Sequence, residues 1–452
     1  MGCDIQPADA AEVTVYIVNR NYGRFLRQAI ESVLVQSHAG LEIVVVDDAS
    51  EDESAAVLAA FESHPRIRIL RNDRVRGLTA CCNAAIRESH GRLVMRLDAD
   101  DFLAPRAIEV LAGAMLREPG AALACCGHVA VDVKGVSLGS FLPRPRAGSA
   151  TAPDLPPHGA CVMVRRRFLD RMGGYDEAIP CQDGLDLWLH VGPEDRVLTV
   201  NEPLVHYRQH AGNLSRGTAA LMAARGKILA KHVAKRGLVR PRVKAVVMAD
   251  WASSSPVAPL TPLAGKPLIE WCLDEALGCA GLDAVVLRTS EVEVQRHAAR
   301  RYGAAVQVEA GESSQAPAQA AAGFDAVLQL DVRSPFLSRG LMQQAIHAMQ
   351  LFEAGEVLAV QREDGVLLRH DGTGLQSLRD GASVRREEDE LYRQCPGLTL
   401  LRTQPAPLAG EAARRSHVLL DQAAGFTIRT ALDLEFAALM ARARLSADAD
   451  AA

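Results

Sequence analysis

Apolar runs alternate with amphipathic segments along the first half of the chain. The β-branched run 13–18 is typical of a buried strand, and the segment after it repeats apolar residues at helical spacing. The same alternation continues through two further strand–helix pairs and reaches a strand predicted over 91–101. This βαβαβ order predicts an α/β fold with a mostly parallel, doubly wound sheet.

The pattern is interrupted and then resumes in the second half. A helix predicted over about 218–236 is followed by the breaker segment "RGLVRPR", and "VKAVVMAD" then begins a new strand. Strands and helices alternate again up to a closing helix over 431–445. Because 452 residues exceed one ordinary core, we predict a domain over 1–216, a helical linker over 217–241 and a second doubly wound domain over 242–452.

Composition narrows the class of protein. Hydrophobic residues make up 48% of the chain and charged residues 23%, as in globular proteins, and the formal net charge of -5 without a basic stripe argues against nucleic-acid binding. No apolar run is long enough for a transmembrane helix, and no secretory signal is visible. Ten scattered cysteines without a CxxC pair argue against zinc and favour reduced thiols in a cytoplasmic protein.

Acidic residues follow two of the predicted strands, at Asp47-Asp48 and at 98–101. In open parallel sheets, ligands bind beyond the carboxyl ends of the strands. Residues two apart on a strand share a face, so Asp98 and Asp100 are expected to converge while Asp101 points elsewhere. Carboxylate pairs of this kind suit Mg²⁺ or Mn²⁺. Acidic turns and helix caps without any ligand are the alternative.

Several segments in order resemble the family 2 inverting glycosyltransferases, which have a GT-A nucleotide-sugar fold. They are "TVYIVNRNYGRFLRQAIESVLVQS", "LEIVVVDDASEDES", "NDRVRGLTACCNAA", "RLDADDFL", "VRRRFLDRMGGYDE", "QDGLDLWLHV" and "VHYRQHAGNLSR". The resemblance covers Val13 to Arg216. Each motif is loose, but their combination in this order is specific.

The resemblance implies a set of ligand-binding residues. Those expected around the nucleotide are Asn19, Asn21, Asp48, Asn83 and Asp98. Asp100 and His210 are expected to bind the metal, Mn²⁺ or Mg²⁺. For Asn83 a bracing role stays open, and for His210 a plain surface position. Weaker candidates for contacts to the diphosphate or the acceptor are His158, His206, Arg208 and Ser215.

The resemblance also implies the catalytic base. Family members usually have Glu-Asp where this chain has Gln182-Asp183, and the aspartate deprotonates the acceptor hydroxyl. Gln182 removes a negative charge beside Asp183, which should make Asp183 a weaker base. Asp186 is the fallback, although it is better placed to orient its own helix, and Trp188 is expected in the core.

Segments of the second half resemble cytidylyltransferases that act on sialic-type acids, over about 244–441. The closest are "LAGKPLIEW", "LQLDVRSPFL" and "GFTIRTALDLEFAALMA". The loop 249–262 has no cation before Lys266, which we interpret as a turn residue, and Thr427 and Arg429 stand where the family has metal-binding aspartates. We therefore predict that this domain is catalytically degenerate.

Together these features predict a metal-dependent inverting glycosyltransferase. It would move a sugar from a nucleoside-diphosphate sugar to a glycan or lipid-linked acceptor in surface polysaccharide assembly. One alternative is a bifunctional glycosyltransferase and sugar cytidylyltransferase, and another is a non-catalytic nucleotide-sugar-binding scaffold. A homodimer through the C-terminal domain and peripheral contact with a membrane are further hypotheses.

Overall fold

The computed structural model describes residues 12–143, 161–210, 218–249, 257–310, 322–363, 365, 367–370, 375–377, 391–403 and 414–450. His158 and Ser215, both named above as weaker candidates, lie outside these residues. The chain divides into two compact units, one of Met1–Gly217 with Gly365–Glu390 and one of Thr218–Asp364 with Leu391–Ala452. Within the described ranges, none of the helices combines the length and apolar character needed to cross a bilayer.

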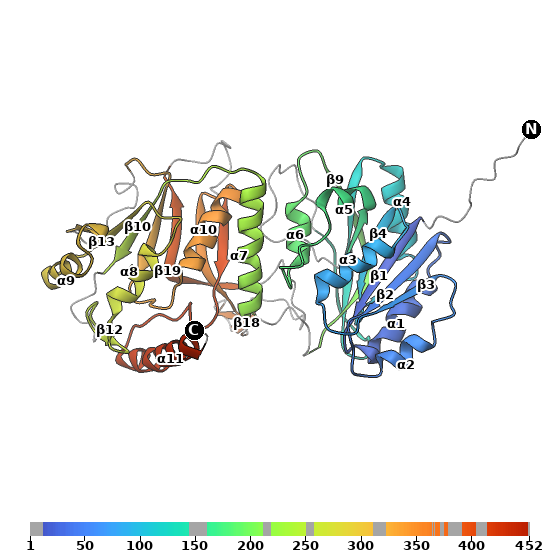
Figure 1. The fold of residues 1–452 in the computed structure, drawn as a ribbon, viewed down its shortest axis with the longest axis horizontal. Coiled ribbons are helices and arrows are strands. Elements are labelled where there is room, and N and C mark those ends of the chain that lie inside the picture. Colours follow the sequence, from blue (N-terminus) through green and yellow to red (C-terminus); the bar gives the residue numbers. More distant parts are fainter. Residues whose placement is uncertain are drawn as a thin grey trace, which may run out of the picture. The chain divides into compact units, whose positions relative to one another are not determined.

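The first unit alternates strands and helices as predicted (Figure 1). Its strands are β1 (Val13–Asn19), β2 (Leu41–Asp47), β3 (Ile67–Arg71), β4 (Leu93–Asp98), β5 (Phe102–Leu103), β6 (Ala121–Val131), β7 (Ser137–Phe141), β8 (Val162–Arg165) and β9 (Arg196–Arg208). Its helices are α1 (Gly23–Leu34), α2 (Ser54–Ala59), α3 (Leu78–Glu88), α4 (Ala107–Arg117), α5 (Arg166–Met172) and α6 (Asp183–Leu189).

The sheet of this unit has apolar cores on both faces. Its strand order is β3-β2-β1-β4-β8-β6-β9-β5, and the four strands from β3 to β4 are parallel. Val15 and Ile17 of β1 pack with helices α1 and α4, whereas Tyr16 packs on the opposite face with α3, α5 and α6. Burial on both faces explains why β1 is a continuous apolar run. The doubly wound α/β fold is confirmed.

One detail of the predicted strand 91–101 is wrong. Strand β4 ends at Asp98, and the Asp101 amide donates to the Asp98 carbonyl at 3.0 Å, which closes a turn. The rule that alternate residues share a face therefore does not apply to Asp98 and Asp100. The turn forms because Asp101 is pulled inward, where its Oδ1 accepts a hydrogen bond from the Arg208 amide at 2.8 Å.

The second unit contains another mixed sheet, of order β14-β13-β10-β15-β19-β16-β20. Its strands are β10 (Val243–Met248), β13 (Ala284–Arg288), β14 (Gln307–Glu309), β15 (Ala326–Asp331), β16 (Glu356–Arg362), β19 (Tyr392–Arg402) and β20 (Arg415–Leu419). Its helices are α7 (Thr218–Lys235), α8 (Leu268–Leu277), α9 (Val292–Tyr302), the 3-10 turn η3 (Gly303–Ala305), α10 (Arg339–Leu351) and α11 (Ala431–Asp450).

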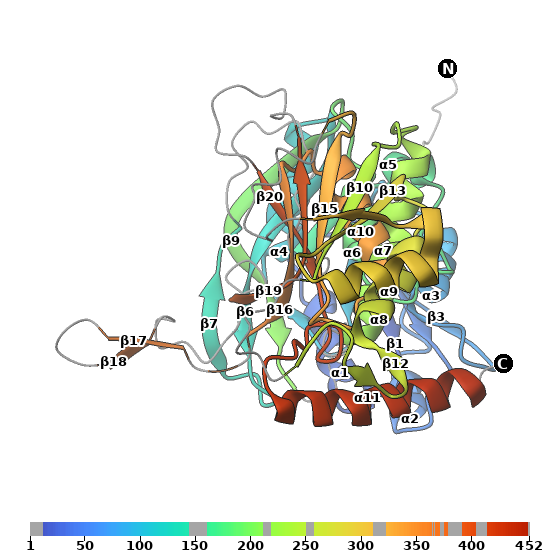
Figure 2. The same ribbon diagram turned by 90° about the vertical axis from the view of Figure 1, so that its left-hand side faces the viewer.

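Two short hairpins complete the described fold. Strands β11 (Pro262–Leu263) and β12 (Lys266–Pro267) form one, and β17 (Leu368–His370) and β18 (Leu375–Ser377) form the other (Figure 2). Helix α7, in the segment predicted as a linker, packs against α10 of the second unit, where the Met222 carbonyl accepts a hydrogen bond from Gln344 at 3.2 Å. The domain limits given above stay predictions.

Candidate active site

Polar residues from several strands meet at the carboxyl edge of the first sheet. Asn19 ends β1 opposite Asp47 of β2, and Asp98 at the end of β4 lies opposite Val18 of β1. The apolar runs stop in register, so the first polar residue after each run emerges at the same edge of the sheet. This edge contains Asn19, Asn21, Asp48 and Asp98 of the residues predicted to surround the nucleotide, whereas Asn83 lies within α3.

Asn19 and Asn21 shape the loop after β1. The Asn19 side chain is fully buried and donates to Asp47 Oδ1 at 2.7 Å and to Ser54 Oγ at 2.9 Å. Asn21 is exposed with φ of 59°, a left-handed conformation that asparagine tolerates, and its Oδ1 accepts from the Glu51 amide at 2.8 Å. Asn19 therefore supports the loop from below, while Asn21 presents its side chain at the surface.

Asp48 holds the loop that leads into α3. Its Oδ1 accepts hydrogen bonds at 2.8 Å from the Asn72 side chain and the Arg76 amide, and its Oδ2 accepts from the Gly77 amide at 2.9 Å. Gly77 has φ of 92°, which favours glycine at this turn. Burial alone would raise the pKa of Asp48, but these hydrogen bonds outweigh it, and the net pKa lies below its usual value. The carboxylate is therefore ionised and already engaged by the protein.

Replacing Asp48 by alanine is expected to lower the free energy of unfolding by about 1–3 kcal/mol, because three donors lose their acceptor. The folded-state pKa lies below the unfolded one, so this stability is present above the unfolded pKa and is lost as the pH falls through the folded pKa. Urea unfolding should show a gap between wild type and variant near neutral pH that narrows below about pH 4. The exposed Asp73→Ala is the matched control. A gap that stays constant across this range would contradict the assignment.

Asn83 braces a segment between α5 and α6. Its Oδ1 accepts from the Tyr175 amide at 2.8 Å, and its Nδ2 donates to the Tyr175 carbonyl at 2.9 Å and to Glu177 at 3.0 Å. Both ends of the amide are thus occupied by the protein. The geometry favours the bracing role over direct contact with a ligand.

The acidic turn after β4 separates its three carboxylates. Asp98 Oδ1 lies 2.9 Å from Arg96 Nε, and Asp100 Oδ2 lies 2.9 Å from His210 Nε2. Asp101 is 1% exposed and turns away, as expected, to bind the Arg208 amide. Burial and the neighbouring Asp98 raise the pKa of Asp100, an effect that His210 partly offsets. Burial and the other two carboxylates raise the pKa of Asp101.

Arg208 is a structural residue and not an open diphosphate ligand. It is 1% exposed, and its guanidinium donates to the carbonyls of Asp100, Asp132 and Val133 and to Gln28 Oε1, at 2.7–3.1 Å. This fixes the backbone of the acidic turn. His206 stacks on Phe102 with ring centroids 4.3 Å apart, and burial lowers the pKa of its imidazole.

His210 lies next to the acidic turn although 110 residues separate it from Asp100. Its side chain is 3% exposed and packs between Tyr22 and Phe25, each with ring centroids 5.5 Å away. Burial and the charges of Asp100 and Asp98 raise the pKa of Tyr22 to about 12, so its hydroxyl is neutral. The plain surface position is therefore wrong, because a nearly fully buried imidazole faces a carboxylate.

Asp183, the predicted base, begins α6 and forms a buried ion pair. Its Oδ2 binds Nη1 of Arg96, and both side chains are 10% exposed. Burial would lower the pKa of Arg96, but Asp183 and Asp98 hold it well above its usual value. One guanidinium therefore joins the predicted base to a predicted nucleotide ligand.

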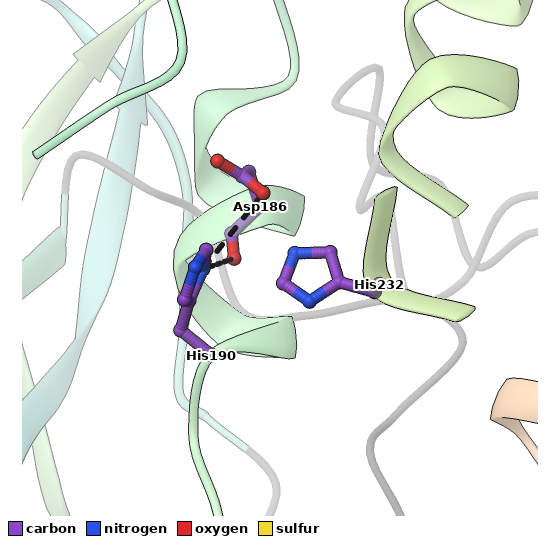
Figure 3. A group of neighbouring side chains, drawn as sticks. All are labelled: Asp186, His190 and His232. Atoms are coloured by element: carbon purple, nitrogen blue, oxygen red, sulfur yellow. Dashed lines mark hydrogen bonds and ion pairs between the residues drawn. The ribbon is translucent and has the colours of Figure 1, made fainter. Parts of the chain in front are cut away.

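Asp186, the fallback for the base, lies three residues after Asp183 on the same helix. Asp186 lies beside His190 one turn further on, where the Asp186 carbonyl is 2.8 Å from His190 Nδ1 (Figure 3). His232, drawn in the same figure, belongs to α7 of the second unit. Gln182 precedes the helix in a left-handed conformation with φ of 61°. Trp188 is 1% exposed and is a core residue as predicted.

In the second unit, the aspartate at the corresponding strand end, Asp331, is paired within the described structure. Both oxygens of Asp331, at the end of β15, bind the Arg333 guanidinium at 2.5–3.0 Å. Lys266 closes the two-residue turn between β11 and β12 and pairs with Asp274 at 2.6 Å, which supports its interpretation as a turn residue. The Thr427 hydroxyl lies 3.2 Å from Ser334, and the Arg429 amide donates to Asp433.

Sequence reasoning missed Arg96 and Tyr22. Tyr22 directly follows Asn21, which is predicted to lie near the nucleotide, so the position of Tyr22 beside the acidic turn could have been predicted from the sequence. Arg96 was read as part of an apolar strand, and the one available signal was a charged residue inside a run otherwise typical of a buried strand.

Comparison with known proteins supports the family resemblance predicted for each half of the chain. Residues 14–173 match the model of glycosyl transferase family 2, and residues 256–441 match the model of the cytidylyltransferases. The chain is 30% identical over 220 residues to "O-antigen biosynthesis protein RfbC" of Myxococcus xanthus, which covers 47% of this chain and 17% of that protein. It is 26% identical over 210 residues to "Putative glycosyltransferase EpsE" of Bacillus subtilis, covering 45% of this chain and 76% of that protein.

Among solved structures, TarS 1–349 of S. aureus in complex with UDP aligns with a TM-score of 0.39 and 15% identity, over 49% of this chain and 65% of that one. At this TM-score the likeness supports no further conclusion. The chain spans less than a fifth of the length of the Myxococcus protein. Residues 14–173 are therefore similar to glycosyl transferase family 2, and residues 256–441 are similar to the cytidylyltransferases.

Proposed function

We propose that the first unit is a metal-dependent inverting glycosyltransferase that uses a nucleoside-diphosphate sugar. The observation that supports this best is the arrangement around the end of β4. The strand and its turn place Asp98, Asp100 and the Arg96 partner of Asp183 at one edge of the sheet. A metal ligand and a buried carboxylate base at one edge are what transfer from a phosphate leaving group to a hydroxyl requires.

The residues at the acidic turn fit Mn²⁺ or Mg²⁺. Asp100 and His210 offer an oxygen and a nitrogen ligand 2.9 Å apart, and Asp98 and Asp101 add two further carboxyl groups at the same turn. The buried Oδ2 of Asp101 has no hydrogen-bond partner in the described structure. A divalent cation held there would supply positive charge to the departing diphosphate.

Each step of the proposed reaction is then assigned to particular residues of the chain. Asp183 takes the proton from the acceptor hydroxyl as its oxygen forms a bond to the anomeric carbon. The bond from that carbon to the phosphate oxygen breaks, and the nucleoside diphosphate leaves from the opposite side. A single displacement inverts the anomeric configuration. Asp98, Asn21 and the loop held by Asp48 surround the nucleotide.

The acceptor and setting are proposed from the relatives. One similar protein is named for O-antigen biosynthesis, so we propose a glycan or lipid-linked acceptor in surface polysaccharide assembly on the cytoplasmic side. The prediction that the second unit is catalytically degenerate rests on the loop 249–262 without a cation and on Thr427 and Arg429, and the pairing of Asp331 with Arg333 supports it. The second unit is then an accessory domain, and one role for it is to form the contact between two copies of the chain.

A panel assay tests this function. The full chain is incubated with nucleotide sugars, with and without Mn²⁺, and released nucleoside diphosphate is measured. We expect release from at least one donor, and loss of release when the metal is chelated. A parallel arm with CTP and acidic sugars should give no pyrophosphate. Pyrophosphate release would establish the bifunctional alternative, and donor binding without any turnover would favour the scaffold.

A further inference from the structure

Arg96 is a charged residue within an apolar layer. Alternation along β4 places Val94 and Arg96 on the face that packs with α3, α5 and α6, and Val94 joins the core cluster there. The Arg96 side chain is 10% exposed. Burying an unpaired guanidinium is strongly unfavourable. The residues that pair with Arg96 therefore explain how the fold can hold a charged side chain at this position.

The two partners come from both halves of the proposed reaction. Nη1 of Arg96 binds Asp183 Oδ2, and its Nε lies 2.9 Å from Asp98 Oδ1. Two carboxylates share one positive charge. Asp183 Oδ2 is thereby occupied, and no hydrogen bond in the described part of the chain engages its Oδ1. Oδ1 is the oxygen left to receive a proton.

From this geometry we propose that Arg96 is a positioning residue, which fixes the orientation of Asp183 and gives it a positively charged partner, so that Oδ1 is the proton acceptor. The proposal rests on the proposed glycosyltransferase function. Gln182 does not bind the guanidinium, because its buried Oε1 has no hydrogen-bond partner in the described structure, and Asp186 lies beside His190 instead. The chain thus supplies a positive partner for the base where it lacks the usual acidic neighbour.

The other titratable groups against Asp183 are neutral near physiological pH. They are Cys82 of α3, Cys181, and Tyr175 between α5 and α6. Burial, with a contribution from Asp183, raises the pKa of each one, that of Cys82 to about 12. Among the described residues, the charged side chains next to Asp183 are therefore Arg96 and, behind it, Asp98.

The test compares Arg96→Gln, Arg96→Lys and the exposed control Arg92→Gln in the full chain. Turnover is measured as nucleoside diphosphate release across a pH range, with folding followed by thermal unfolding. For Arg96→Gln we expect kcat to fall about 10–100-fold on the acidic side and to recover partly in alkali, because the base loses its stabilising charge. The acidic limb should move up by about one pH unit or more.

Arg96→Lys should restore part of kcat and shift the limb less, because it keeps the charge but loses the forked geometry. It also carries the test if Arg96→Gln does not fold. If a folded Arg96 variant kept the acidic limb of its pH profile at the wild-type position, the proposed role of Arg96 would be overturned, but the proposed glycosyltransferase function would not. A wild-type protein that releases no nucleoside diphosphate from any donor would overturn the proposed function, and the role of Arg96 with it.

Discussion

Replacing Asp183 by asparagine is expected to lower the rate of sugar transfer about 10²–10⁴-fold, the range that a positioned general base contributes. Asparagine has nearly the same shape and can still accept a hydrogen bond from Arg96, so the fold should be kept. It cannot take a proton at neutral pH. The loss should therefore fall on kcat, with donor binding changed little. Steady-state kinetics and calorimetric titration of the donor measure the two quantities separately.

Asp186→Asn is the matched control for this prediction. Asp186 lies on the same short helix, three residues further on, but beside His190 and not beside Arg96. It should keep most of the wild-type turnover. If the Asp186 variant lost activity while the Asp183 variant kept it, Asp186 and not Asp183 would be the base. If both kept full activity, the proposed reaction would need another proton acceptor.

The order of elements and the edge of the sheet could be predicted from sequence because both are local. β-branched runs, helical spacing and the polar residue that ends each run are read along the chain. The fold class was predicted in this way, whereas the resemblance to the two families rests on short motif segments, which are also local in the sequence. The position of Asp183 at the start of a helix was also accessible, because the acidic residue stands before an apolar helical segment.

Partners across the fold were much harder to predict. Arg96 and Asp183 are 87 residues apart, and Asp100 and His210 are 110 apart. The end of β4 depended on Arg208, whose buried guanidinium holds the acidic turn from a distant strand. Asn19 and Asn83 were read as nucleotide contacts because they lie in motif segments. In the structure Asn19 Nδ2 donates to side chains of the protein, and both ends of the Asn83 amide bond to the protein, which no spacing in the sequence indicates.

Replacing Asp100 by alanine is expected to lower turnover about 10³-fold, because charge stabilisation by a bound metal is worth several kcal/mol in the transition state. The same variant should bind Mn²⁺ more weakly, measured by calorimetry on the full chain. His210→Ala should weaken metal binding less, since the charged ligand Asp100 remains. Asp73→Ala, which changes an exposed acidic residue of the same unit, should alter neither quantity.

The two readouts together decide what the acidic turn does. If Asp100→Ala abolished turnover while Mn²⁺ affinity stayed at the wild-type value, the carboxylate would act on the sugar nucleotide itself and not through a cation. If affinity fell but turnover did not, the metal would be dispensable. The metal reading requires both to fall, and to fall in the same order, with Asp100 before His210. That order follows from charge, because a carboxylate neutralises a divalent cation and an imidazole only coordinates it.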